Sequence, residues 1–548
     1  MNRYKSHLLI LITVIGIFFH SCEKNFDPKI YGSFTQASFP TTREDYINAA
    51  MACYIPFASH WTYNFYGSGT QHTWYIPEGG MMRLFDAPTD LMAPLTTTGL
   101  GGDWLRFSNA DFSNTVYYGR GAASANVVNH FQAIGDVTRM TQILKLISDA
   151  PVEVLDQKTK EELMAEIRLC RGLHMYYTFH IYGPLPFITD IDKIYDEEAL
   201  LQMERPSLQI CVEKITEDFE YAVSYMPTKE VVTEKGRYNR DYARYLLMRH
   251  SLNEGSYMDG YYQRAVDMYN ELEGKYSLFD VGDNPYAEQF MSKNKFNKEV
   301  LMAVSVSPTS TASSTTGNGN PIGMYVVPND VSTMVGDNPE LDPHGPGWAQ
   351  YFNVSVKFYD SFEADDLRAK TILTSYKGGD GSIRTRTDIG SKWSGFILNK
   401  FKPEVKGTSQ PMDIPLARWA DVLLMYAEAT TRLNNSVETS AIDAVNEVRK
   451  RAGLNGLTPT KTNTVANFLD AILEERGHEL FFEGGSRKVD LIRFNMYAQK
   501  CKSVNGVLPT HQYMPVPNFA VLQAAELGVE FTQVYSRPGW SEDISKSN

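Results

Sequence analysis

Aromatic side chains cluster in two polar, glycine-rich stretches, and exposed rings in such a context could bind a ligand by stacking. Trp61, Trp74, Tyr75 and Trp104 fall in the first stretch, and Trp348 follows a Gly-Pro-Gly sequence in the second. A sugar ring has an apolar face of C–H groups and an edge of hydroxyls, so an exposed aromatic ring can stack on the face. Large rigid rings supply contact area at little conformational-entropy cost. We predict that these five residues bind a ligand of the glycan class.

The same rings have a structural alternative, in which they pin long loops onto the body of the protein. Three of the seven Trp residues of the chain lie between residues 61 and 104 in polar context, so burial of all of them is not expected. Trp419 differs, because it stands beside Leu423 and Leu424 in a helical pattern. We expect Trp419 in the core.

The sequence lacks the common enzyme motifs. His478-Glu479 is followed by Phe at position 482, so the His-Glu-x-x-His zinc motif is not formed. The chain has no phosphate-binding loop and no Gly-x-Ser-x-Gly nucleophile elbow. Asp380 lies among glycines, where a turn is favoured over a calcium site. We predict no catalytic residue, no metal ligand and no cofactor. A glycosidase needs two carboxyls set by the fold, and the sequence does not test for them.

A dense set of charges near residue 480 has two interpretations, an acid/base site or a structural network of ion pairs. Because Leu473, Leu480, Phe481 and Phe482 share this segment, part of it must face the core. We favour ion pairs at i, i+3 and i+4 along and just beyond one helix. The charged residues are Glu474, Glu475, Arg476, Glu479, Glu483 and Arg487.

Composition and charge narrow the function classes. The 548 residues are 43% apolar and 21% charged, which is typical of a globular protein with a large core. The net charge of −13 makes nucleic acid a poor partner, since phosphates require a basic surface. Beyond Cys22 the cysteines are scattered and none has metal-site spacing. We expect Cys53, Cys170 and Cys211 as small core residues.

The N-terminus carries a targeting signal. Arg3 and Lys5 precede an apolar run over residues 8–19, which is too short to span a bilayer but fits a signal-peptide core. Ser21 then stands directly before Cys22, as in lipoprotein signals. We predict a signal peptide over 1–21 and a lipid-modified Cys22, which tethers the body of the protein to a membrane.

Apolar periodicity predicts a mainly α-helical protein. Capping boxes at Thr41–Glu44 and Thr159–Glu162 mark two helix starts. Regular periodicity is lost over about 58–121 and 280–415, which read as loop-rich insertions. The division of the chain is then 22–57, 58–279 and 280–548. The expected helices cover about 41–57, 124–148, 159–181, 207–225, 239–257, 261–274, 417–433, 439–452 and 465–482.

Several motifs resemble the SusD/RagB family of Bacteroidetes surface lipoproteins. Pro415–Ala429 (PLARWADVLLMYAEA) is similar to a hallmark of that family, and Ala444–Gly453 and Ile472–Gly484 resemble two more. Arg171–Pro186 resembles the family's Arg-Ala…Tyr…Gly-x-x-Pro helix, with Gly172 where Ala is usual. The late segment Tyr513–Pro517 fits its Pro-rich element.

The resemblance implies a fold of tetratricopeptide-like helix pairs with loop-rich insertions, located at the outer membrane and facing the exterior. It implies a partner, a SusC-like TonB-dependent transporter, and a ligand that is an oligosaccharide or polysaccharide, or in some members a peptide. Family members are not enzymes. The motifs belong to the scaffold, so no ligand-binding residue is carried over. A peptide-binding protein, a surface glycoside hydrolase and a purely structural scaffold remain alternatives to glycan capture.

Overall fold

The fold is described by a computed structural model, and its contacts divide the chain into two units, Met1–Tyr46 and Ile47–Asn548. The chain parts expected at 58–279 and 280–548 both fall in the second unit. The residues that the structure describes are 39–59, 62–64, 70–77, 79–93, 106–112, 130–201, 204–306, 319–342, 345–347, 352–385, 395–407, 409–506, 508–538 and 540.

The described part of the first unit is the start of helix α2 (Arg43–Met51). The Asp45 carboxylate accepts hydrogen bonds from the backbone N–H groups of Thr41 and Thr42, at 3.0 and 2.9 Å. These bonds lower the pKa of Asp45. The Asp45 N–H in turn donates to the Thr42 hydroxyl at 3.2 Å. The capping box is therefore one residue later than the sequence predicted.

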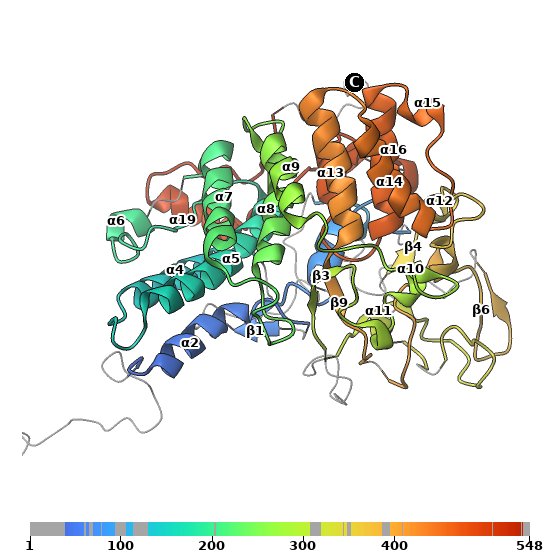
Figure 1. Cartoon of the computed structure of the whole chain (residues 1–548), viewed down its shortest axis with the longest axis horizontal. Coiled ribbons are helices and arrows are strands. Elements are labelled where there is room, and N and C mark those ends of the chain that lie inside the picture. The colour runs from blue at the N-terminus through green and yellow to red at the C-terminus, as the bar shows by residue number, and fades with distance from the viewer. Residues whose placement is uncertain are drawn as a thin grey trace, which may run out of the picture. The chain divides into compact units, whose positions relative to one another are not determined.

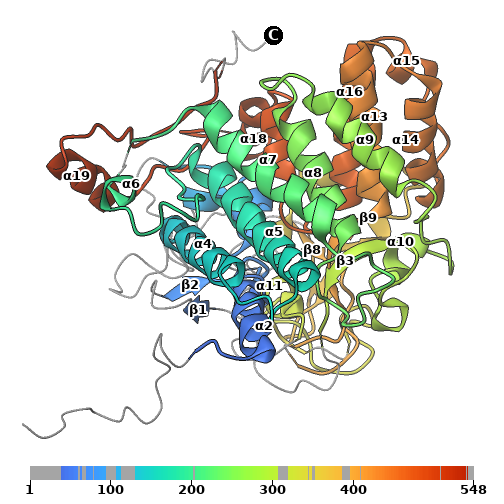
Figure 2. The same ribbon diagram turned by 60° about the vertical axis from the view of Figure 1, so that its left-hand side comes forward.

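Long helices form the scaffold of the second unit. Successive helices pack side by side in the order α4, α5, α7, α8, α9, α13, and α13 packs on both α14 and α16 (Figures 1 and 2). This confirms the mainly α-helical fold that the apolar periodicity predicted. The bounds are α4 Ala133–Ser148, α5 Gln157–Tyr182, α7 Leu208–Tyr225, α8 Arg240–Glu254, α9 Tyr261–Leu272, α13 Trp419–Asn434, α14 Thr439–Arg451 and α16 Val465–Leu480.

Local capping sets where these helices begin. The N-cap of α5 is Asp156, whose carboxylate accepts the Thr159 N–H at 3.0 Å. The prediction that Thr159 opens this helix was wrong, because Asp156, three residues earlier, caps the first turn and places Thr159 inside the helix. Trp419 is buried and stacks on Tyr269, which confirms its place in the core.

The described residues also form shorter helices. In sequence they fall before α4, between the long helices or after α16. Their bounds are η1 Ala52–Tyr54, the π-helix η2 Met82–Asp86, η3 His130–Gln132, α6 Glu197–Leu200, α10 Pro285–Glu288, η4 Ser292–Asn294, α11 Ile322–Val326, α12 Val356–Tyr359, η5 Ala369–Thr371, α15 Pro459–Thr462, α17 Arg487–Arg493, α18 Tyr497–Asn505 and α19 Asn518–Glu526.

The loop-rich insertions contain short antiparallel strands that periodicity did not reveal. The strands β3 and β9 pair across more than a hundred residues of sequence, with irregular register near Met302. The other pairings are β1 with β2, β6 with β7, and the sheet β4-β8-β5. The bounds are β1 Thr62–Asn64, β2 Thr70–His72, β3 Val300–Val304, β4 Asn353–Val354, β5 Ile372–Leu373, β6 Tyr376–Lys377, β7 Ile383–Arg384, β8 Phe396–Leu398 and β9 Ile414–Arg418.

A buried network of ion pairs joins the helices to these strands. Its centre is Arg418, at the end of β9, which pairs with Glu299 at 2.6 Å and with Glu479 at 2.8 Å. Arg368 reaches Glu475 at 2.6 Å and Glu479 at 3.3 Å. We call this the Arg418 network. Its members are Arg368, Lys400, Arg418, Arg449, Arg451, Glu299, Asp366, Glu475, Glu479 and Glu483.

The structural interpretation of the charges near residue 480 is therefore confirmed, but the expected pairing pattern was wrong. Glu475 and Glu479 pair with arginines of other elements instead of along their own helix. Arg476 likewise pairs with Asp421 of α13 at 2.7 Å, and Arg487 pairs with Asp90 at 2.6 Å. Buried charges need several partners each, and one helix face cannot supply them.

Replacing Glu479 with Gln is expected to lower the free energy of unfolding by about 3–5 kcal/mol, because it leaves the buried network with one uncompensated positive charge. Burial alone would raise the pKa of Glu479, but Arg451, Arg418 and Arg368 outweigh it and lower the pKa. This stabilisation is fully present above the ordinary carboxyl pKa of 4.5, and it is lost progressively as the pH falls from there toward the lowered native pKa, so that a first part of it is gone at pH 4. Urea unfolding at pH 7 and at pH 4 measures both effects.

The matched control is Glu474→Gln, one turn earlier on α16. Glu474 is half-exposed and pairs with Lys461 at 2.7 Å, so we expect a loss below about 1 kcal/mol. Equal losses for the two variants, or a difference between Glu479→Gln and wild type that does not shrink at pH 4, would contradict the role given to Glu479.

Candidate functional site

Trp74 and Tyr75, two of the predicted ligand-binding residues, are buried. The Trp74 side chain is 0% exposed and donates its Nε1–H to Nδ1 of His174 at 2.7 Å. It also stacks on the ring of His130, with centroids 4.6 Å apart. The hydroxyl of Tyr75 lies 3.0 Å from that of Tyr238, and burial raises the pKa of Tyr75 well above its ordinary value. The exposed stacking face predicted for these two rings is not present.

Their role in the structure is the alternative one, since they fasten the first insertion to the helices. The backbone N–H of Trp74 donates to the carbonyl of Pro56 at 2.8 Å, and the Trp74 carbonyl accepts from Met81 at the same distance. Gly80 allows this close turn, because a Cβ there would lie 2.2 Å from the Trp74 oxygen. The polar sequence around Trp74 did not predict these contacts, which bury the indole ring.

Trp61, Trp104 and Trp348 lie outside the described residues, so their binding role stays a prediction. The described residues that flank them in the sequence nevertheless meet in three hydrogen-bonded pairs, which we call the stem pairs. The Ser59 hydroxyl donates to the carbonyl of Gly319 at 3.2 Å. The other two pairs are Ala93 N–H to Asn353 oxygen at 2.8 Å, and Gly347 N–H to Pro328 oxygen at 3.1 Å.

The three stem pairs lie close to helix α11 (Ile322–Val326). Gly319 precedes this helix, and Pro328 follows it. The carbonyl of Tyr325, within α11, accepts the Phe352 N–H at 3.2 Å, next to Asn353. Position 347 requires glycine, because a Cβ there would lie 1.9 Å from the backbone oxygen of Val327. The first insertion therefore attaches beside this short helix of the second, which lies at the loop-rich end of the unit below α13 in Figure 1. We call α11 together with the three stem pairs the α11 face.

A hydrophobic core beneath α11 holds the two insertions together. Met82 and Met92 of the first insertion pack in one buried cluster with Tyr325 and Phe352 of the second. The cluster also includes Phe482, just beyond α16. Asp86, within the π-helix η2, accepts the Gly484 N–H at 2.9 Å, and burial raises the pKa of Asp86 to about 7. The segment just beyond α16 thus contacts the first insertion through Gly484 and belongs to the Arg418 network through Glu483.

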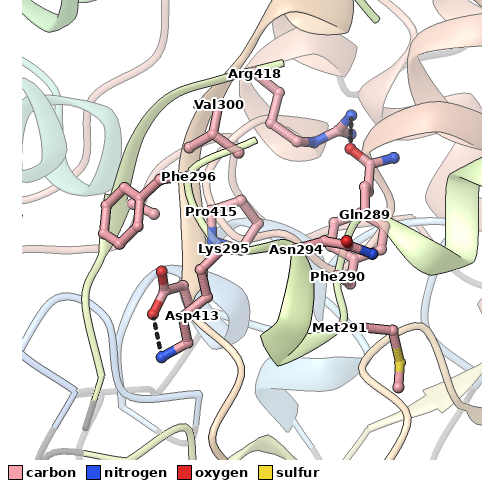
Figure 3. Close-up of a pocket in the computed structure, with 11 residues that line it drawn as sticks. Gln289, Phe290, Met291, Asn294, Lys295, Phe296, Val300, Asp413, Pro415 and Arg418 are labelled. Carbon is pink, nitrogen blue, oxygen red and sulfur yellow. Dashed lines mark hydrogen bonds and ion pairs between the residues drawn. The ribbon is translucent and has the colours of Figure 1, made fainter. Parts of the chain in front are cut away.

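A small cavity beside β3 and β9 is a second candidate, drawn in Figure 3. Lys295 pairs with Asp413 at 2.9 Å on one side of it, and Arg418 donates to the Gln289 side chain at 3.3 Å on the other. Burial raises the pKa of Asp413. The cavity volume of about 20 Å³ holds about one water molecule. It is too small for a sugar ring.

The described residues contain no group of three or more His, Cys, Asp or Glu side chains placed to hold a metal ion. Asp380 forms the turn that the sequence favoured, accepting the N–H and hydroxyl of Ser382 at 3.0 and 2.6 Å. Cys53, Cys170 and Cys211 are buried free thiols, as predicted. In the same part of the chain, no helix has the length and apolar character needed to cross a membrane.

Stacked helices that carry a loop-rich face, built from distant segments, define a class of helical-repeat scaffold proteins. The SusD family model matches residues 376–520 of this chain. This match and the similarity to curated SusD-like proteins confirm the resemblance to the SusD family that the motifs indicated.

The curated relatives that the chain matches support the same family. A SusD-like protein of Bacteroides ovatus is 25% identical over 367 residues, which cover 63% of this chain and 62% of that protein. The starch-binding protein SusD of Bacteroides thetaiotaomicron is 24% identical over 382 residues, covering 61% of this chain and 64% of that one. The aligned region thus spans just under two thirds of each relative.

Solved structures share the fold over nearly the whole chain. A laminarin-binding SusD-like protein superposes with a TM-score of 0.65 at 20% identity, covering 91% of this chain and 100% of that one. Surface glycan-binding protein A from Bacteroides thetaiotaomicron, in complex with laminarihexaose, gives 0.65 at 18% identity, covering 88% and 98%. A SusD homologue from the same species gives 0.68 at 16% identity, covering 92% and 99%.

Replacing Trp74 with Phe is expected to destabilise the protein by about 1–3 kcal/mol, because the buried His174 nitrogen loses its donor. Thermal unfolding measures the loss, and hydrogen exchange should rise in residues 70–77. Affinity for ligand should change less than about two-fold, since the Trp74 ring is fully buried and offers no surface to a ligand. A large loss of affinity with unchanged thermal stability would show instead that Trp74 contacts the ligand.

Proposed function

We propose that this protein is a cell-surface lipoprotein that captures an oligosaccharide or polysaccharide and delivers it, chemically unchanged, to a SusC-like TonB-dependent transporter in the outer membrane. The observation that carries the proposal is the meeting of the three stem pairs at α11. Each stem pair flanks one of Trp61, Trp104 and Trp348 in the sequence. These three rings are the proposed stacking surfaces for sugar.

The names of similar proteins support a glycan as the ligand. One curated relative is a starch-binding protein, and two of the similar structures are a laminarin-binding protein and a complex with laminarihexaose. The acidic net charge of −13 also favours an uncharged ligand over an anionic one. In this proposal the buried Trp74 and Tyr75 do not touch the ligand. They fix the first insertion to the helices, Trp74 through its hydrogen bond to His174 of α5.

A binding screen tests the proposal. The full-length protein, in detergent, should be retarded in native gels that contain one polysaccharide from a panel of plant, fungal and host polymers, with starch and laminarin first. Replacing Trp61, Trp104 and Trp348 together with Ala should weaken binding at least 100-fold, because stacking contributes about 1 kcal/mol or more for each ring. Titration with oligosaccharides of the retarding polymer measures the loss.

The control for the triple variant is Trp540→Ala, outside the α11 face, which should leave retardation unchanged. Retardation by no polymer, together with affinity for extended peptides, would replace this proposal with the peptide-binding alternative. Release of reducing ends from a polymer would point to a glycoside hydrolase. Transporter binding without any ligand affinity would leave a structural scaffold.

The proposed anchor is tested separately. Replacing Cys22 with Ala removes the only proposed acceptor for the acyl chains, each buried CH₂ of which contributes about 0.8 kcal/mol to membrane binding. We expect the variant to move from the membrane fraction to the soluble fraction and to lose surface labelling in intact cells. Retention of the variant in the outer membrane would contradict lipidation at Cys22.

A further inference from the structure

An open groove that no part of the proposed function uses lies at the far end of the long helices. Three elements enclose it, α15, one face of α16 and the start of α18. Its volume is about 410 Å³, which is within the range of about 300–1,000 Å³ typical of small-molecule sites. We call it the α16 groove.

Helical spacing explains why one side of α16 forms a wall of the groove. Asn467, Asp470 and Glu474 are three to four residues apart and therefore lie on one helix face. Lys461 of α15 pairs with Glu474 at 2.7 Å and closes one end. Lys500 of α18 lines the groove as well.

The side chains that line the groove carry equal numbers of positive and negative charges and offer both hydrogen-bond donors and acceptors. Two ammonium groups are matched by two carboxylates, and Lys461 and Glu474 already neutralise one another. The side chains of Asp470 and Lys500 form no ion pair with another described residue. An anionic ligand would meet the carboxylates and a cationic ligand would meet the lysines, so the balance favours a neutral ligand.

The same lining favours a ligand rich in hydroxyl groups. Asp470 only accepts hydrogen bonds, Lys500 only donates them, and Asn467 does both. A hydroxyl can donate to the first and accept from the second. Met496 and the buried Leu473 add an apolar strip, which suits the C–H face of a sugar ring. We propose that the α16 groove is a second oligosaccharide-binding site, separate from the α11 face.

The two sites lie at opposite ends of the same helices. In both views α15 is at one end of α14 and α16, and β3, β9 and α11 lie toward the other end (Figures 1 and 2). A polysaccharide long enough to reach both sites gains affinity by avidity, while a short oligosaccharide does not. The inference rests on the proposed function, since it assigns the groove the same class of ligand.

The test compares two double variants of the full-length protein. Asp470→Ala with Lys500→Ala removes the unpaired charges of the groove. Asp443→Ala with Lys450→Ala removes the same charges from the exposed face of α14 and is the matched control. The ligand is the hexasaccharide of whichever polymer is retarded in the screen, with laminarihexaose first. Calorimetric titration counts sites, and native gels measure binding of the polymer.

We expect two hexasaccharide sites in the wild type and in the control, and one in the groove variant. Polymer binding by the groove variant should be at least ten-fold weaker. In the Trp61, Trp104 and Trp348 triple variant, the hexasaccharide should still reduce hydrogen exchange in residues 460–474 and 496–500. A single site that the groove variant leaves intact overturns this inference and leaves the proposed function standing. Absence of any sugar binding overturns both, and peptide binding that only the groove variant loses overturns the sugar assignment.

Discussion

The Arg418 network is the interaction on which the rest of the structure depends. Five cations and five carboxylates are buried together where β3, β9, α14 and α16 meet. Such a network adds little net stability over apolar packing, since each charge must first lose its water. It does require one arrangement, because any shift of α16 leaves an uncompensated charge. We infer that it specifies the register of the helices against the strands.

The helices were predictable because their signals are local. Apolar periodicity and caps act within a few residues, so the long helices lie within a few residues of their expected ends, except that α4 begins at Ala133 instead of near residue 124. The strands β3 and β9 were not predictable, since each is short and pairs with a segment more than a hundred residues away. The partners of Glu475 and Glu479 were missed for the same reason, because they come from three other segments of the chain.

The candidate site was less predictable than the fold. Polar, glycine-rich sequence correctly marked Trp74 as part of a loop, but it carries no signal for His174, the distant partner that buries the indole. Helix α11 has only five residues and a buried apolar sequence, so it has no amphipathic period to detect. Its role at the junction of both insertions follows only from contacts such as Ser59 to Gly319.

The α11 face and the helical scaffold are mechanically linked through one short segment. Glu483 pairs with Arg418 in the network, and the next residue, Gly484, donates its N–H to Asp86 of the first insertion. Gly484 has a positive φ of 83°, which glycine adopts without strain. Phe482, on the other side of Glu483, belongs to the core beneath α11. The described part of the first insertion is therefore tied to the Arg418 network through three consecutive residues, so a shift of this segment would disturb the network and the core beneath α11 together.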